Sequence, residues 1–208
     1  MDKEPIIALI RDTLSFANVF ASDQVLRDIA AYFEPASFAK YHMLVTEGKA
    51  SSANFFMTDG FMRAFTHDLE GEEVTTYFFY KNRPVFEGIS LFTGARSTEN
   101  IQAVTECHGF ALAIERLNIL FHSIPEFREF GRAMLVREFA AYKKRTLSLI
   151  NQTAEERYRD LIETNKEIFQ HVPLKYIASY LGITDTSLSR IRKEFSRKPA
   201  DDHSLRAE

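Results

Sequence analysis

Apolar and polar residues alternate in two different rhythms along the chain. In the first, apolar residues recur every four positions at Val25, Ile29 and Phe33, which predicts an amphipathic helix over 24–33. From 37 to 114, short runs rich in Phe, Tyr, Val and Thr are instead interrupted by turn signals that contain glycine. This regular spacing of strand-forming runs and turns is typical of an all-β barrel or roll.

One pair of these runs predicts a β-hairpin. The dipeptide Asp59-Gly60 lies between the strand-like runs 54–58 and 61–67. Because glycine accepts a positive φ angle in a tight turn, we expect the two runs to pair as antiparallel neighbours.

A second change of pattern predicts a long helix from 123 to 150. Ser123 and Glu126 have the spacing of a capping box, and Pro125 suits a first helical turn. The apolar seam of this helix lasts about three heptads, which is typical of pairing with an equivalent helix. The alternative is a helix that packs on its own β domain. The expected dimer residues are Phe127, Gly131, Met134, Leu135, Phe139, Tyr142 and Thr146.

A further helix begins the C-terminal part of the chain. Thr153 and Glu156 again have the capping-box spacing, and Arg157 is expected on an outer face of that helix. A length of 208 residues suits two unequal domains. We therefore expect an α+β protein with a β-roll domain over 1–122, a dimerisation helix over 123–150 and a helical domain over 151–208.

The segment 174–193 predicts a helix-turn-helix. Ala178 is small enough to let two helices cross closely, and Gly182 supplies a permissive backbone for the turn. Thr184 is placed to cap the second helix. The apolar residues expected between the two helices are Ile177, Leu181, Ile183, Leu188 and Ile191.

The exposed face of the second helix suits the major groove of DNA. Short polar side chains near a helix start reach base edges, and Arg190 is able to donate two hydrogen bonds to guanine. The alternative is an ordinary helical hairpin with a solvated basic face. The expected DNA-binding residues are Lys175, Thr184, Asp185, Thr186, Ser187, Ser189, Arg190, Lys193 and Arg197.

The distribution of charge favours the same interpretation. The net charge is −3, yet 172–198 holds six cationic and two acidic residues, a local +4 that leaves −7 elsewhere. An acidic body with one basic module is expected when that module alone meets phosphate. With one cysteine, no leader-like start and no apolar run near the roughly 20 residues of a membrane span, we expect a cytoplasmic protein without a membrane partner.

These parts, in this order, resemble the cyclic-AMP receptor protein/FNR (Crp/Fnr) family of transcription regulators. The helix from Ser123 looks like the family's dimer helix, and 174–193 looks like its DNA-binding motif. The resemblance implies a double-stranded β-helix, or jelly-roll, sensor domain and a winged-helix-like reader. It also implies a homodimer on inverted-repeat double-stranded DNA, with RNA polymerase as a partner. The runs that look like strands and turns of a cyclic-nucleotide-binding roll are Thr46-Glu47-Gly48-Lys49, Phe55-Phe56-Met57-Thr58-Asp59-Gly60, Arg63-Ala64-Phe65 and Gly71-Glu72-Glu73.

The effector pocket departs from the family pattern. In nucleotide-binding members, a Gly-Glu pair and a following Arg bind the ribose hydroxyl and the cyclic phosphate. Here the order is Glu87-Gly88, the arginine position falls near Ser97, and Glu99 adds negative charge. The departure predicts a small-molecule effector other than cyclic AMP, or none. The candidate pocket residues are Glu87, Gly88, Ile89, Ser90, Arg96, Ser97 and Thr98.

Other chemistries find little support in the sequence. An iron–sulfur cluster needs about four thiolates, whereas Cys107 is the single cysteine, and the six histidines lack the paired spacing of a metal site. No nucleophile–base motif or phosphate loop is present, so we expect neither an enzyme nor a metal or cofactor. A cyclic-nucleotide-binding module that acts on a protein partner stays open as an alternative. The tail 199–208 has no strand-like run that would form a wing.

Overall fold

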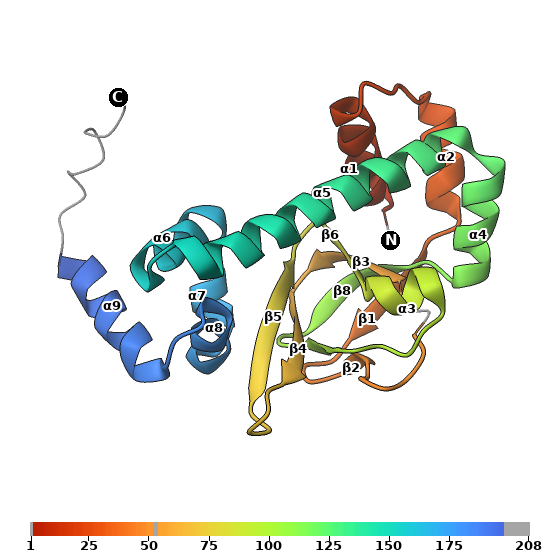
Figure 1. The fold of residues 1–208 in the computed structure, drawn as a ribbon. Coiled ribbons are helices and arrows are strands. Elements are labelled where there is room, and N and C mark those ends of the chain that lie inside the picture. Colours follow the sequence, from red (N-terminus) through yellow and green to blue (C-terminus); the bar gives the residue numbers. More distant parts are fainter. Residues whose placement is uncertain (1, 52–53, 198–208) are drawn as a thin grey trace. The chain divides into compact units, whose positions relative to one another are not determined.

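The computed structural model describes residues 2–51 and 54–197 of the chain. These residues divide into two compact units on either side of the junction between Thr146 and Leu147. The first unit holds two sheets, and five helices begin in it (Figure 1). The last of these helices continues into the second unit, which is helical.

The first unit is built on two antiparallel four-stranded sheets. The order in the first sheet is β1 (Glu34–Phe38), β8 (Cys107–Ala111), β3 (Asn54–Asp59) and β6 (Arg83–Phe86). The order in the second sheet is β2 (Met43–Val45), β7 (Asn100–Ala103), β4 (Phe61–His67) and β5 (Glu73–Tyr80). The interior between them is apolar because alternate residues of a strand face the same side, as Met62 and Ala64 of β4 do. The predicted β-roll is thus confirmed.

The hairpin predicted at Asp59-Gly60 is wrong. Although Gly60 has a φ angle of +103°, β3 lies in one sheet and β4 in the other. Gly60 is needed for a close approach: a Cβ atom there would lie 2.5 Å from the carbonyl oxygen of Glu106. The antiparallel neighbours of β4 are instead β5 and β7.

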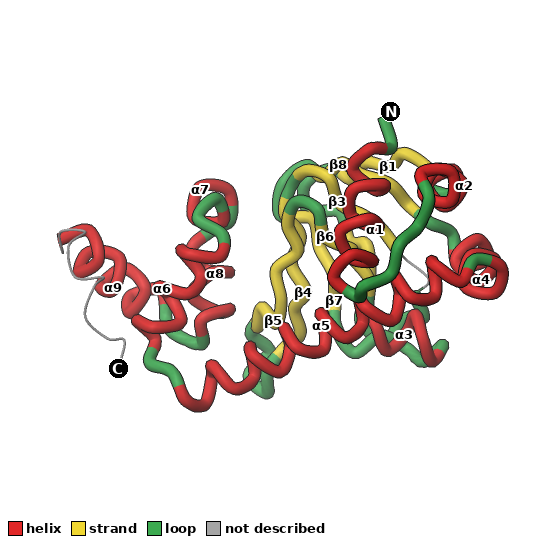
Figure 2. The backbone as a smooth tube through the Cα atoms, turned by 90° about the horizontal axis from the view of Figure 1, so that it is seen from above, coloured by secondary structure: helices red, strands yellow, loops and turns green. Residues whose placement is uncertain are grey.

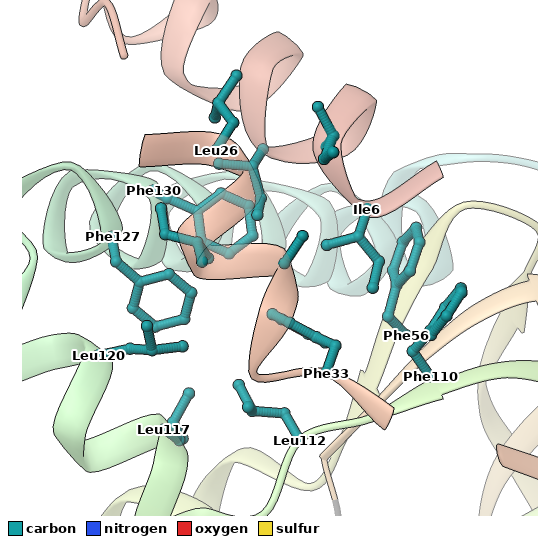
Figure 3. Packing of buried hydrophobic residues seen from close by; sticks show 14 of the residues in the cluster. Ile6, Leu26, Phe33, Phe56, Phe110, Leu112, Leu117, Leu120, Phe127 and Phe130 are labelled. Carbon is teal, nitrogen blue, oxygen red and sulfur yellow. The ribbon is translucent and has the colours of Figure 1, made fainter. Parts of the chain in front are cut away.

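Five helices begin in the first unit, and most of them share one apolar cluster. They are α1 (Glu4–Phe16), α2 (Asp23–Ala31), α3 (Gly88–Thr93), α4 (Ile114–Ser123) and α5 (Pro125–Asn151). The side chain of Ser22 caps α2 by accepting a hydrogen bond from the amide of Val25. Figure 3 shows how Ile6 and Leu26 from α1 and α2 meet Phe127 of α5 and Phe56 of β3. This cluster fixes α5 against the roll through its N-terminal half.

The start of α5 differs from the expected capping box. Ser123 is the last residue of α4, and Ile124 follows it with an extended backbone. The carbonyl oxygen of Ile124 accepts hydrogen bonds from the amides of Phe127 and Arg128, so the helix begins at Pro125. Proline suits this first position because the N–H that it lacks would have no partner within the helix there. Figure 2 shows α5 as a single uninterrupted helix.

The second unit forms a small helical domain. Its helices are α6 (Ala154–Thr164), α7 (Ile168–His171), α8 (Leu174–Leu181) and α9 (Asp185–Arg197). The capping box predicted for α6 is confirmed, since Thr153 and Glu156 each bond the other's backbone amide. Tyr158 lies at the centre, with its ring 5.2 Å from that of Phe169 and 5.0 Å from that of Phe195.

Candidate nucleic-acid interface and effector pocket

The turn between α8 and α9 has the geometry expected of a helix-turn-helix. Gly182 ends α8 with a φ angle of +67°, and the amide of Ile183 donates to the carbonyl oxygen of Ala178 at 3.0 Å. Thr184 then caps α9, because its Oγ1 accepts from the amide of Ser187 at 3.3 Å. Ala178 is buried where the helices meet. Each local role predicted for these residues is confirmed.

The two helices bury the expected apolar residues. Ile177 and Leu188 are fully buried, and Leu181 and Ile191 are nearly so. Ile183 in the turn is half-buried. On α9, Leu188 and Ile191 are turned inward and Phe195 packs on Tyr158, whereas most of the other positions face away from the domain core.

Most of the expected DNA-binding residues are exposed, at the start and on the outward surface of α9 or, for Lys175, on α8. Ser187 is half-buried, and the side chain of Arg197 lies outside the described residues. The guanidinium of Arg190 lies 3.9 Å from the carboxylate of Glu194, a loose exposed pair that leaves Arg190 able to find another partner. The exposed residues of the expected set are Lys175, Thr184, Asp185, Thr186, Ser189, Arg190 and Lys193.

Arg157 has a role that sequence reasoning missed. Instead of facing solvent, it is half-buried and donates from Nε to the carbonyl oxygen of Leu181 at 3.0 Å. Its Nη1 donates to the carbonyl oxygens of Gln152 and Ser148. Carbonyl groups at helix ends lack partners within the helix, so Arg157 fixes α8 relative to the last turn of α5. No sequence signal separates this arginine from a solvated one.

The helix α5 has two different faces along its length. Phe127 is 2% exposed, and Gly131 is buried where a Cβ atom would lie 2.5 Å from the ring of Phe121. Met134 is half-buried against the same apolar cluster. These three residues pack within their own unit, as the alternative interpretation of the seam expected. Phe127, Gly131 and Met134 are therefore withdrawn from the expected dimer surface.

The rest of the expected dimer residues form an exposed stripe. Leu135 is 39% exposed, Phe139 70% and Tyr142 40%, and Thr146 is also exposed. Their spacing of four, three and four residues keeps them on one side of the helix. Tyr142 also stacks on Tyr77 of β5, with ring centroids 4.9 Å apart. We name Leu135, Phe139, Tyr142 and Thr146 the α5 stripe.

The carboxylate of Glu87 caps the start of the short helix α3. Glu87 is buried, and its two carboxylate oxygens accept from the amides of Ile89 at 3.0 Å and Ser90 at 2.7 Å. The hydroxyl of Ser90 accepts in turn from the amide of Ser51 at 2.7 Å. The transposed order Glu87-Gly88 therefore places the acid at the cap of the helix. The two backbone amides at this helix start are therefore already bonded.

The other candidate pocket residues are also bonded within the chain. Ser97 is buried, and its hydroxyl donates to the carbonyl oxygen of Glu99 at 2.6 Å. Arg96 is exposed and donates to the carbonyl oxygen of Gly48 at 3.1 Å. Burial raises the pKa of Glu99, a hydrogen bond from Thr76 lowers it, and the charge of Glu87 raises it further. Ile89 and Thr98 are exposed and Gly88 is half-buried, so this loop offers an anion little free cationic charge.

In 2–51 and 54–197, no three or more His, Cys, Asp and Glu side chains are grouped so as to hold a metal ion. None of the helices within those ranges is long and apolar enough to cross a membrane. The thiol of Cys107 is buried, and burial raises its pKa.

Comparison with solved structures identifies the fold. FixK2 from Bradyrhizobium japonicum matches with a TM-score of 0.67 and 16% identity, over 79% of this chain and 84% of that one. The c-di-GMP-responsive global regulator CLP of Xanthomonas campestris matches with a TM-score of 0.63 and 13% identity, over 84% and 92%. A protein from Eubacterium rectale assigned to the Crp/Fnr family matches with a TM-score of 0.64 and 12% identity, over 88% and 86%. No protein-family model and no curated protein matches the sequence. The chain thus has the Crp/Fnr fold, which confirms the expected fold class.

Proposed function

We propose that this protein is a transcription regulator of the Crp/Fnr type that binds inverted-repeat sites in double-stranded DNA as a homodimer. In this proposal, 1–122 is the sensor, 123–150 the dimerising segment and 151–208 the reader of DNA. RNA polymerase is its further partner, as the family resemblance implies. The observation that carries the proposal is the helix-turn-helix of α8 and α9, with its buried inner face and polar outer face.

The dimensions and chemistry of α9 support its role as the reading element. An α-helix with side chains is about 10–12 Å wide, which fits a major groove about 12 Å wide. Arg190 projects from the exposed face of α9, where its planar fork is suited to the two acceptors of guanine. Lys193 and Lys175 are exposed point charges suited to phosphates. Two such helices in a homodimer favour a site whose half-sites lie about one helical turn apart.

The environment of the roll supports an effector other than cyclic AMP, or none. The amides at the start of α3 are bonded to Glu87, and Ser97 replaces an arginine that would meet the phosphate. Losing such a charge-assisted contact costs about 1.5–3 kcal/mol. Glu99 adds a second carboxylate near the same loop. A cyclic phosphate would therefore meet negative charge where it needs positive charge.

A binding experiment with matched variants tests the proposal. Fragments selected from genomic DNA would be measured against the parent, Arg190→Ala, Lys193→Ala and the control Lys166→Ala. Lys166 is an exposed cation of the second unit that lies outside α8 and α9. We expect Arg190→Ala to lose about 1–3 kcal/mol and discrimination at one base pair. Lys193→Ala should weaken all duplexes alike and lower the salt slope by about one.

Two results would refute this proposal. If Arg190→Ala and Lys193→Ala bind every duplex as the parent and Lys166→Ala do, while circular dichroism shows intact helices, α9 is not the reading element. If the parent shows no salt-sensitive affinity for duplex DNA, the helix-turn-helix serves another purpose. Releasing counterions from phosphate gives a steep salt dependence that docking to a protein partner seldom matches.

A further inference from the structure

A polar cleft lies between α1, the turn that joins β5 to β6, and α5. Its volume is about 240 Å³, and its lining includes Thr13, Lys81, Arg83, Arg137 and Glu138. These residues belong to the first unit, and Figure 1 shows α1, β6 and α5 as neighbours there. The cleft is separate from the candidate pocket loop 87–98, which contributes no residue to its lining.

The lining of this cleft carries an excess of positive charge. Lys81, Arg83 and Arg137 are cationic, and Glu138 is the only acidic residue among those that line it. Glu138 is already engaged: its Oε1 lies 3.4 Å from Nη1 of Arg83, and its Oε2 accepts from the hydroxyl of Tyr77 at 3.1 Å. Three positive charges against one negative charge leave a net +2 around the space.

Two of these cations have no carboxylate partner in the part of the chain that the structure describes. Neither Lys81 nor Arg137 forms an ion pair within 2–51 and 54–197. The contact recorded for Arg137 is with the ring of Phe16, 5.8 Å from the guanidinium carbon. A cation over an exposed ring gains only about 0.5–1 kcal/mol, so an anion would be a stronger partner.

The frame around the cleft is held in place by other contacts. Asn82, in the turn, has a φ angle of +61°, and its amide donates to the carbonyl oxygen of Met57 at 2.9 Å. Arg83 also donates from Nη2 to the hydroxyl of Tyr80 at 3.2 Å. Thr13 is 1% exposed on the opposite wall. Arg83 and the backbone of the turn that carries Lys81 are therefore held in place before any ligand binds.

We infer that this cleft binds a small anion that carries a phosphate group. A net charge of +2 matches a phosphate dianion, and arginine and lysine together supply the charge-assisted hydrogen bonds that phosphate oxygens accept. Sites for drug-sized ligands occupy about 300–1,000 Å³, so a cleft of about 240 Å³ suits a smaller molecule.

Of the α5 residues that line the cleft, Arg137 faces away from the α5 stripe, whereas Glu138 lies beside it. Each residue of a helix turns about 100° from the one before it, so Arg137 lies about 160° around α5 from both Leu135 and Phe139 of the α5 stripe, on average. A ligand that engages Arg83 also competes with Glu138, which pairs α5 with Arg83 of β6. Use of such a ligand as an effector rests on the proposed function, whereas its binding does not.

Calorimetry on the full chain without DNA tests the inference. The probes are inorganic phosphate and, at equal ionic strength, the dicarboxylate succinate. The variant Lys81→Gln/Arg137→Gln removes the two unpaired cations, and Lys40→Gln/Lys144→Gln removes two exposed cations outside the lining. We expect saturable phosphate binding by the parent and the control, and affinity at least tenfold weaker in the cleft variant.

Three results would overturn the inference. Phosphate binding that does not saturate in the parent would indicate general counterion attraction. Equal affinity in the cleft variant and the control variant would place the site elsewhere. Succinate binding as tight as phosphate binding would refute the phosphate assignment. Failure of the parent to bind DNA would refute the proposed function and leave these results unchanged, so the two ideas fail separately.

Discussion

Replacing Leu135 and Phe139 together by glutamate should convert the proposed dimer into a monomer. Both side chains belong to the α5 stripe, and the structure leaves them 39% and 70% exposed. Burying a whole Leu or Phe side chain contributes about 1.5–3 kcal/mol, and only the exposed part remains to be buried in a dimer. Scaling by exposure gives about 2–3 kcal/mol for the pair in each protomer.

A two-fold dimer uses the stripe twice, so the expected loss is about 5 kcal/mol. This corresponds to a several-thousandfold weaker dimer, before the added cost of desolvating four carboxylates. Sedimentation velocity at about micromolar concentration would detect this change. Because neither side chain is buried in the protomer, circular dichroism of the variant should match that of the parent.

A matched control separates the stripe from general loss of apolar surface. Phe92 in α3 is 50% exposed and Ile119 in α4 is 48% exposed, so Phe92→Glu/Ile119→Glu removes a similar exposed area away from α5. We expect this control to sediment as a dimer. If the α5 variant sediments as the parent does, or the control dissociates equally, the interface lies elsewhere and the reasoning fails.

Three further outcomes are expected. First, Glu99→Gln should raise the free energy of unfolding at pH 7, because folding raises the pKa of Glu99 above 4.5 and an ionised Glu99 destabilises the folded state. When urea unfolding is repeated at lower pH, the gain should disappear at about pH 4.5 and below, where Glu99 is protonated in both the folded and the unfolded state. A gain that is constant with pH would contradict this cause. Second, Thr153→Ala should lose about 1 kcal/mol in urea unfolding because it removes the capping box of α6, whereas Thr164→Ala at the end of that helix serves as the control. Third, calorimetry with cyclic AMP should show at most weak binding, and micromolar affinity would instead identify Arg96 as a phosphate ligand.

The features that the sequence predicted best depend on short-range rules. The turn at Gly182, the cap at Thr184 and the capping box at Thr153 each follow from residues within four positions of one another. A left-handed backbone and an orphaned amide are satisfied locally, so a local pattern suffices to predict them. The spacing of apolar residues by three and four positions then predicts which face of α8 and α9 is buried.

The features that the sequence missed depend on distant partners. Gly60 accepts the positive φ angle of a hairpin, yet Glu106 and Cys107, about 46 positions away, decide that the chain crosses to the other sheet. The seam of α5 looks continuous, but Phe121 of α4 covers Gly131 and leaves Leu135 exposed. Apolar periodicity predicts that a helix has an apolar side, but it does not predict which element covers that side.

The candidate site also has a part that local rules predicted and a part that depends on distant partners. For α9, the exposed polar residues could be placed from helical spacing alone. For the loop after β6, the sequence showed that Glu87 and Gly88 are transposed, but the bonds from Glu87 to two backbone amides required the three-dimensional structure. Arg157 is the clearest omission, because its three carbonyl partners come from two separate places in the chain, the end of α5 and the end of α8.

The carboxylate of Glu87 acts as a built-in competitor at the start of α3. A group tethered a few bonds from its binding place competes at an effective concentration in the millimolar range or above, and it never diffuses away. A free anion at micromolar concentration would therefore have to displace an occupant that outnumbers it about a thousandfold. Metabolite levels that fluctuate in that lower range would leave α3 unchanged, so this loop would remain in one state at micromolar concentrations of anions.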